Sequence, residues 1–232
     1  AHGFAEMGAE VIKYTSLDDI YDKVTRNDIV VDYIDQSKAI LNKFNVQPHC
    51  IDYPEELKPF MGRKIWVDTI DSINSNPSKW GIFVKPVKEK AFTGKIINSP
   101  KDLIGCGSES DNYEVLCSEV LNMKREWRCF VKYDEIADIK PYRGDYHYNY
   151  DPNVVDQILE SFKTISGRPM GCSVDIAVVE QEGKLKTVFL EMNDGYSLGA
   201  YGLHHLDYAK VLSARWSQLL GVEDEYDFRK YR

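Results

Sequence analysis

The apolar positions of the chain follow two different patterns, which change near residue 80. Up to about residue 60, short alternating stretches at 10–14 and 28–33 predict strands, interleaved with helical stretches as in a βαβ unit. The first residues predict a helix that leads directly into the strand at 10–14. This order is typical of a chain from which an earlier strand is missing. Residues 63–74 have a helical pattern, and the polar run 74–79 reads as a linker. We therefore expect a small βαβ-like domain and a connecting helix over 1–74.

Beyond residue 80 most apolar stretches alternate, which predicts antiparallel strands. Residues 173–179 and 186–192 predict a hairpin around the turn 181–184. Two amphipathic helices are expected, over 152–166 and 208–220, because their apolar residues recur on one face. Strands grouped with flanking helices indicate an α+β fold for this part of the chain.

Composition excludes several classes of protein. An apolar fraction of 43% and a charged fraction of 28% are those of an ordinary globular protein. A net charge of −8 disfavours binding to nucleic acid. Five cysteines without a CxxC pair suit neither a zinc site nor a disulfide framework, so a cytoplasmic location is expected. We see no signal peptide and no apolar run of the ~20 residues that span a membrane.

The C-terminal hairpin carries the first candidate site. Glu191 and Asn193 are two residues apart on one strand, so their side chains point to the same face. A three-residue loop at 182–184 sets Asp175 of the partner strand opposite Glu191. Two carboxylates and an amide oxygen suit Mg²⁺, which completes its shell with waters and phosphates. The alternative is that EMNDG is only a strand that runs into an Asn-Asp-Gly turn.

A lysine-rich segment follows the strand GIFVKPV. Lys85 ends this strand, where it can reach a phosphate as a point charge. The next turn, KEKAFTGK, adds Lys88, Lys90 and Lys95, and for Lys88 we favour a solvated hairpin tip. The segment lacks GxxxxGK[ST], so it is not a P-loop.

The stretch YEVLCSEVLNMKREWRCFV places charged residues on two successive strands. Glu119 could lie beside an adenine, while Glu126 could accept hydrogen bonds from ribose hydroxyls. Arg128 shares a strand face with Glu126. The alternative is that both glutamates are surface residues at sheet edges.

The order of these motifs resembles the ATP-grasp superfamily, which includes D-alanine–D-alanine ligases and ribosomal-protein glutamate ligases. FVKPVKEKAFTGK, EWRCFV and FLEMNDGYSLGAYGL are similar to small stand-alone members from bacteria and their viruses, in the clade named for one arginine and two lysines. The resemblance covers roughly residues 63–216. It implies an ATP-grasp domain over 75–232, with lobes of about 75–118 and 119–232 that clasp ATP. One departure is the turn after Lys85, which has only Gly94 where many relatives have a glycine-rich loop.

The resemblance also implies a role for each candidate residue. Contacts to ATP are implied for Arg63, Lys85, either Lys90 or Lys95, Glu119 and Glu126; Mg²⁺ coordination for Asp175, Glu191 and Asn193; and contact with the γ-phosphate and the acceptor carboxylate for Arg128 and Arg143. The alternative for either arginine is a surface ion pair without a role in catalysis, for example between Arg143 and Asp145.

The implied reaction joins a carboxylate, on an amino acid, a peptide or another small molecule, to an amine through an acyl phosphate, with release of ADP. No nucleic acid or membrane is expected to take part. Two alternatives remain. Lys132-Tyr133-Asp134-Glu135 resembles the Lys-x-Asp-Gly nucleophile of nucleotidyltransferases, although it also reads as a hairpin turn. The chain could also be a non-catalytic ATP-binding module.

Overall fold

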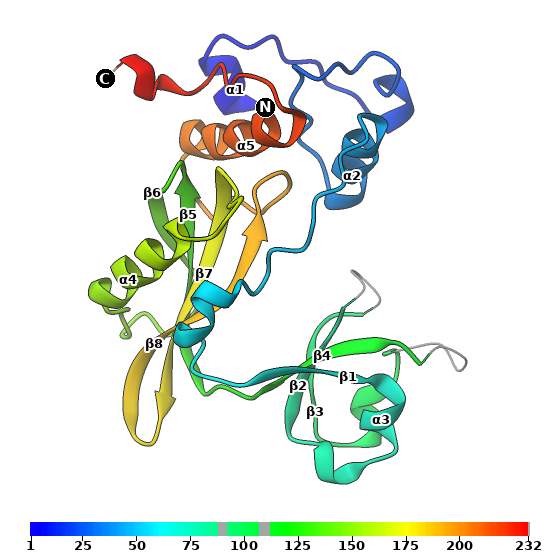
Figure 1. The fold of residues 1–232 in the computed structure, drawn as a ribbon, viewed down its shortest axis with the longest axis vertical. Coiled ribbons are helices and arrows are strands. Elements are labelled where there is room, and N and C mark those ends of the chain that lie inside the picture. Colours follow the sequence, from blue (N-terminus) through cyan, green and yellow to red (C-terminus); the bar gives the residue numbers. More distant parts are fainter. Residues whose placement is uncertain (88–91, 107–111, 232) are drawn as a thin grey trace. The chain divides into compact units, whose positions relative to one another are not determined.

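A computed structural model describes residues 1–87, 92–106 and 112–231 of the chain. Its backbone contacts form two compact units, which we describe separately. Unit 1 comprises residues 1–60, 123–179 and 185–232, and unit 2 comprises residues 61–122 and 180–184. Each unit is built on one four-stranded antiparallel sheet with short helices (Figure 1). The α+β class predicted from the sequence is therefore confirmed.

The sheet of unit 2 has the strand order β1-β4-β2-β3. Its strands are β1 (Ile65–Thr69), β2 (Ile82–Pro86), β3 (Lys95–Ile97) and β4 (Glu114–Glu119). Val84, Ile97, Val115 and Cys117 form a buried core with Ile73 of the neighbouring helix. The buried side chains of β2 and β4 in this core therefore lie on the sheet face that packs against that helix.

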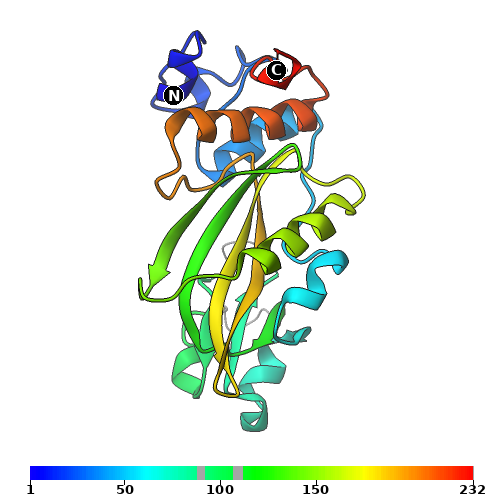
Figure 2. The same ribbon diagram turned by 90° about the vertical axis from the view of Figure 1, so that its left-hand side faces the viewer.

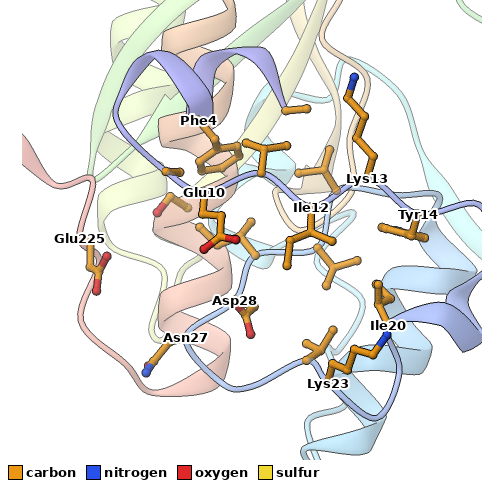
Figure 3. A pocket seen from close by; sticks show the side chains of 18 of the residues that line it. Phe4, Glu10, Ile12, Lys13, Tyr14, Ile20, Lys23, Asn27, Asp28 and Glu225 are labelled. Atoms are coloured by element: carbon orange, nitrogen blue, oxygen red, sulfur yellow. The ribbon is translucent and has the colours of Figure 1, made fainter.

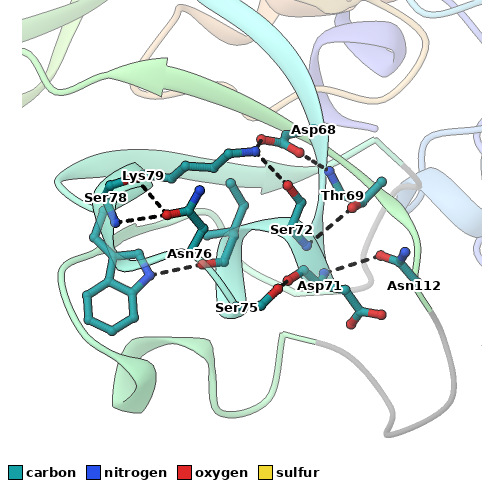
Figure 4. Close-up of polar contacts among 11 residues, drawn as sticks. Asp68, Thr69, Asp71, Ser72, Ser75, Asn76, Ser78, Lys79 and Asn112 are labelled. Atoms are coloured by element: carbon teal, nitrogen blue, oxygen red, sulfur yellow. Dashed lines mark hydrogen bonds and ion pairs between the residues drawn. The ribbon is translucent and has the colours of Figure 1, made fainter.

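Residues 63–79 form a strand, a helix and a turn, which corrects the single helix and linker expected there. After β1 come α3 (Ile70–Asn74) and η3 (Pro77–Lys79). The hydroxyl of Thr69 caps α3 by accepting from the Ser72 amide. Lys79 bonds to Asp68 and to Ser72, each at 2.6 Å (Figure 4). These contacts hold the polar run in place, although its composition alone is typical of a linker. A further turn, η4, spans Pro100–Leu103.

The sheet of unit 1 has the strand order β6-β5-β7-β8. Its strands are β5 (Met123–Lys132), β6 (Glu135–Gly144), β7 (Gly171–Gln181) and β8 (Lys184–Asp194). Helix α4 (Pro152–Lys163) lies beside this sheet, and α5 (His205–Leu220) crosses one end of it (Figure 2). Val211 of α5 packs against the buried Phe130 of β5. Both helices match the amphipathic segments predicted from the sequence.

Residues 1–60 belong to unit 1 mainly because they pack on α5. Helices α1 (His2–Glu6) and α2 (Ile34–Lys43) lie near α5, in the same part of the chain as the 3-10 turn η1 (Leu17–Asp19). The 3-10 turn η2 (Glu55–Phe60) packs on α4 instead, and η5 (Phe228–Tyr231) ends the described chain. Phe4, Ile40 and Leu41 share a buried cluster with Trp216. The contacts thus divide the chain at residue 60, whereas the sequence suggested a boundary at 74. The assignment of 75–232 to a single ATP-grasp domain stays a prediction.

The two strands expected at 10–14 and 28–33 do not form, which corrects the βαβ prediction. Both stretches are irregular and lie outside the strand ladders of the described chain. They line a cavity of about 760 Å³, into which Phe4, Ile12 and Ile20 project (Figure 3). Tyr14 reaches across to Asp32 with a hydrogen bond of 2.5 Å. Val30 is buried in the core, whereas Val11, Ile12 and Val31 are exposed. The interpretation of these stretches as strands was therefore wrong.

Within the described part of the chain, every helix is too short or too polar to cross a bilayer.

Candidate active site

A buried ion pair occupies the middle of the sheet of unit 1. Arg128 on β5 and Asp175 on β7 are directly paired in the antiparallel register. The guanidinium of Arg128 donates from Nε to Oδ1 at 2.9 Å and from Nη2 to Oδ2 at 2.7 Å. The two residues are 7% and 2% exposed, respectively. A bidentate pair this deeply buried fixes both side chains in one geometry.

Asp175 has two further polar neighbours. Asn193 donates from Nδ2 to Oδ2 at 3.1 Å, and the hydroxyl of Ser173 donates to Oδ1 at 3.4 Å. Each carboxylate oxygen therefore accepts two hydrogen bonds, which is its full capacity. Burial raises the pKa of the Asp175 carboxyl, and the fork of Arg128 opposes that rise by stabilising the charged form.

The pKa of Arg128 is set by the same contact. Burial alone would lower it, but the hydrogen bonds to Asp175 raise the pKa of Arg128 above its ordinary value. The guanidinium also lies 4.6 Å from the centroid of the Tyr201 ring, a cation–π contact that favours the charged form. Arg128 is thus a permanent positive charge at this site.

The hairpin of β7 and β8 brings Glu191 to the same place. Besides burial, the charge of Glu191 raises the pKa of Asp175, so the two carboxylates lie close together. Asn193, two residues further along β8, donates to Asp175 directly. The expected three-residue turn is wrong: only Glu182 and Gly183 separate the strands, both with positive φ. A Glu191 oxygen accepts from the hydroxyl of Tyr53 at 3.4 Å.

Glu126 and Arg143 meet on the neighbouring pair of strands, β5 and β6. They are register partners, and Nε of Arg143 lies 3.5 Å from Oε1 of Glu126. The side chain of Glu126 is nearly buried, while that of Arg143 is 78% exposed. Arg143 therefore contacts Glu126. Asp145, the partner expected for Arg143 in a surface ion pair, instead bonds to His147 at 2.7 Å.

Two tyrosines complete the site, and we did not identify either of them from the sequence. Tyr142 donates its hydroxyl to Glu126 at 3.1 Å, and its ring centroid lies 5.0 Å from that of Tyr201. Burial and the nearby carboxylates of Asp175 and Glu126 raise the pKa of Tyr142, so it remains a neutral donor. The signal was available, because Tyr142 directly precedes Arg143 in KPYRGD and Tyr201 lies in GAYGL.

The remaining candidates belong to unit 2. The carboxylate of Glu119 accepts from the Lys64 amide at 2.9 Å, and Lys95 donates to the Ile104 carbonyl at 3.2 Å. Arg63 donates to the Met61 carbonyl at 3.4 Å. Lys85 is half-buried on β2. Lys90, the other candidate for the second phosphate lysine, lies outside the described residues.

Gly94 packs directly against the strand that carries Lys85. A Cβ at this position would lie 2.6 Å from the ring of Phe83 and 3.2 Å from Cβ of Lys85. Any larger residue would therefore require the ring of Phe83 to move. The one glycine in this turn thus has a packing role beside Lys85, which sequence inspection treated only as a departure from the family pattern.

The donor set of unit 1 fits magnesium. The carboxylates of Asp175 and Glu191 and the amide oxygen of Asn193 are hard oxygen ligands, which Mg²⁺ prefers. Asp175 and Asn193 are in direct contact. Both oxygens of Asp175 already accept two hydrogen bonds in this structure, so coordination by Asp175 requires one of its donors, Arg128, Ser173 or Asn193, to give up a bond. Glu191 and Asn193 carry no such constraint from Arg128.

Comparison with solved structures identifies the fold. Phosphoribosylamine–glycine ligase from Thermotoga maritima matches with a TM-score of 0.50 and 13% identity, over 96% of this chain and 72% of that chain. D-alanine–D-alanine ligase from Bacillus anthracis complexed with ATP matches with a TM-score of 0.43 and 15% identity, over 80% of this chain. This chain spans 66% of the length of that D-alanine–D-alanine ligase, and 50% and 57% of the lengths of two other matched structures. No curated protein matches it.

Comparison with family models identifies the family. The model for the ATP-grasp domain of family 2, in the clade named for one arginine and two lysines, matches residues 60–211, which is more than half of the chain. The chain therefore belongs to this ATP-grasp family. The resemblance drawn from the motifs is confirmed, and so is the ATP-grasp fold. The roles of the individual residues stay predictions.

Proposed function

We propose that this protein is an ATP- and Mg²⁺-dependent ligase that joins a carboxylate to an amine and releases ADP and phosphate. The observation that carries the proposal is the convergence of Arg128, Asp175, Asn193 and Glu191 in the sheet of unit 1, in a chain that belongs to an ATP-grasp family. A permanent cation beside a hard-oxygen donor set is what phosphoryl transfer requires of a protein.

The reaction has two steps. An oxygen of the acceptor carboxylate attacks the γ-phosphorus of ATP, and the bond to the bridging oxygen breaks to give an acyl phosphate and ADP. The nitrogen of the amine then attacks the acyl carbon, inorganic phosphate leaves, and the nitrogen loses a proton. No enzyme nucleophile is required in either step.

The proposed roles follow from charge and position. Asp175, Glu191 and Asn193 would hold Mg²⁺, which when bound offsets negative charge on the phosphates. Arg128 would face the γ-phosphate, because it is the buried cation of the cluster. Arg143, with its side chain exposed, would contact the incoming carboxylate. Arginine suits both tasks because its planar fork binds oxyanions bidentately. Glu126 would bond to the ribose and Tyr142 would fix its orientation.

The substrate class we propose is an amino acid or peptide as the carboxylate donor. The test is ADP release across a panel of amino acids, peptides and polyamines, with the product mass measured. The expected product mass equals the sum of the two substrates minus one water. ATP binding without ADP release across the whole panel would instead favour a non-catalytic binding module. We also propose a reducing cytoplasm as the compartment, because all five cysteines are thiols and four of them are buried.

Transfer of AMP to Lys132 is the alternative that the structure allows us to test directly. Lys132 ends β5, and Tyr133 and Asp134 form the turn to β6 with positive φ. Both oxygens of Asp134 accept from the fork of Arg168 at 2.6 Å, which supports a structural role for this turn. We expect intact mass spectrometry after incubation with ATP and Mg²⁺ to show unmodified protein. A stable AMP adduct that is lost in Lys132→Ala would establish that the protein is a nucleotidyltransferase.

Lys85 is proposed to contact a phosphate of ATP. Lys85→Ala should weaken ATP binding roughly tenfold to a hundredfold, because a hydrogen bond to a charged group contributes about 1.5–3 kcal/mol. Lys101→Ala removes an exposed lysine of the same unit and should leave the affinity unchanged. Isothermal titration calorimetry with ATP and Mg²⁺ measures both. Equal dissociation constants for the two variants would remove Lys85 from the nucleotide site.

A further inference from the structure

Two histidines and a glutamate converge on unit 1 where α1 meets the start of α5. His2 and Glu6 are one helical turn apart on α1, and Nε2 of His2 lies 3.2 Å from Oε1 of Glu6. Nε2 of His205, the first residue of α5, lies 2.7 Å from the other oxygen, Oε2. One ligand atom from each residue lies within 4.8 Å of the other two. Two separate elements therefore present three donor atoms to one point.

The packing beneath this cluster fixes its geometry. A Cβ on Gly3 would lie 2.1 Å from the carbonyl oxygen of His205 and 3.1 Å from Cβ of Ala209. Only glycine allows α1 to approach the start of α5 this closely. The next residue, Phe4, is buried in the core that α1 shares with α5. The backbones that carry the three donors are thus held together by core packing, independently of any ligand.

The donor chemistry selects the kind of ion. Two imidazole nitrogens and a carboxylate suit zinc and similar divalent transition metals, whereas Mg²⁺ prefers oxygen ligands alone. Zinc bonds of 2.0–2.2 Å in a tetrahedron place neighbouring ligand atoms roughly 3.4 Å apart. The separations of 3.2 Å between His2 and Oε1 of Glu6 and of 2.7 Å between His205 and Oε2 of Glu6 lie near that value, and all three ligand atoms lie within 4.8 Å of one another.

We propose that His2, Glu6 and His205 form a binding site for a zinc-class divalent cation that clamps α1 to α5. The three side chains supply three ligands and leave a fourth position open to water, since all three are at least partly exposed. This site is separate in residues and chemistry from the oxygen donors proposed to hold Mg²⁺, so its occupancy does not depend on the ligase proposal.

Calorimetry with Zn²⁺ in excess Mg²⁺ tests the site, because Mg²⁺ occupies the oxygen donors and leaves the imidazoles available. The protein should bind one Zn²⁺, and Glu6→Gln and His205→Asn should each weaken that binding at least tenfold. His49→Asn and Cys50→Ser remove two other exposed donors and should have no effect. Unchanged affinity in both Glu6→Gln and His205→Asn would overturn the proposal.

The ¹⁵N NMR signals of the histidine side chains distinguish metal binding from a purely structural role, because a structural role alone would not make these signals respond to Zn²⁺. Zn²⁺ should shift the ¹⁵N signals of His2 and His205 in the intact protein, while those of His49 and His147 stay in place. His204, whose ring centroid lies 4.2 Å from that of His205, reports whether a fourth protein ligand joins. Absence of any shift at His2 and His205 would show that the three residues share only hydrogen bonds.

Discussion

Glu191→Gln should bind ATP with the same affinity in Mg²⁺ as in EDTA, whereas the unchanged protein should bind much more tightly with Mg²⁺. The substitution keeps the size of the side chain and can still accept the hydrogen bond from Tyr53. It removes one of the two carboxylates proposed to hold the cation, and a neutral amide is a far weaker ligand for Mg²⁺. Turnover should fall by on the order of 100-fold or more, because charge on the transferring phosphoryl group is no longer offset.

A matched glutamate elsewhere in unit 1 serves as the control. Glu160 lies on α4 with its side chain exposed and pairs with Lys163 at 2.7 Å. Glu160→Gln makes the same change of charge and should retain the full Mg²⁺ dependence. Calorimetry with ATP, in Mg²⁺ and in EDTA, compares the two variants. If Glu191→Gln keeps the Mg²⁺ dependence of the unchanged protein, Glu191 does not hold the cation.

The part of the chain that sequence could predict best is the C-terminal hairpin. TVFLEM is a short apolar run that follows a turn containing Gly183, which is enough to predict a strand and its hairpin partner. Hairpin partners are close in sequence, so the pairing of β7 with β8 could be predicted, although the turn proved to be one residue shorter than expected. The family resemblance, which was confirmed, drew on FLEMNDGYSLGAYGL in this part of the chain and also on FVKPVKEKAFTGK and EWRCFV.

Other features depend on contacts that no local pattern encodes. Arg128 and Asp175 are 47 residues apart on strands that are not consecutive, so only the β5–β7 register reveals their pairing. The helix expected over 63–74 was wrong because Trp66, Ile70 and Ile73 recur at helical spacing, although Ile65–Thr69 forms a strand. The expected strands at 10–14 and 28–33 failed for a different reason: alternation predicts a half-buried stretch, but a ladder needs a neighbour.

Arg128→Ala should lower the free energy of unfolding by about 3–5 kcal/mol, because it leaves the carboxylate of Asp175 buried without its counter-ion. Arg143→Ala is the matched control. Arg143 also contacts a carboxylate from the same pair of strands, but its side chain is 78% exposed and the separation is 3.5 Å. Its loss should cost about 0–1 kcal/mol. Urea denaturation followed by tryptophan fluorescence measures both, since Trp127 and Trp216 are buried in unit 1.

The double variant Arg128→Met/Asp175→Leu separates the stability of the fold from its chemistry. Replacing both members of a buried ion pair by apolar residues of similar size is often neutral or stabilising, because the cost of desolvating two charges disappears. We therefore expect the double variant to recover most of the stability lost in Arg128→Ala. It should remain inactive in ADP release, because it lacks both the cation proposed for the γ-phosphate and a ligand proposed for Mg²⁺. Recovered stability together with normal turnover would show that Arg128 and Asp175 serve only the fold.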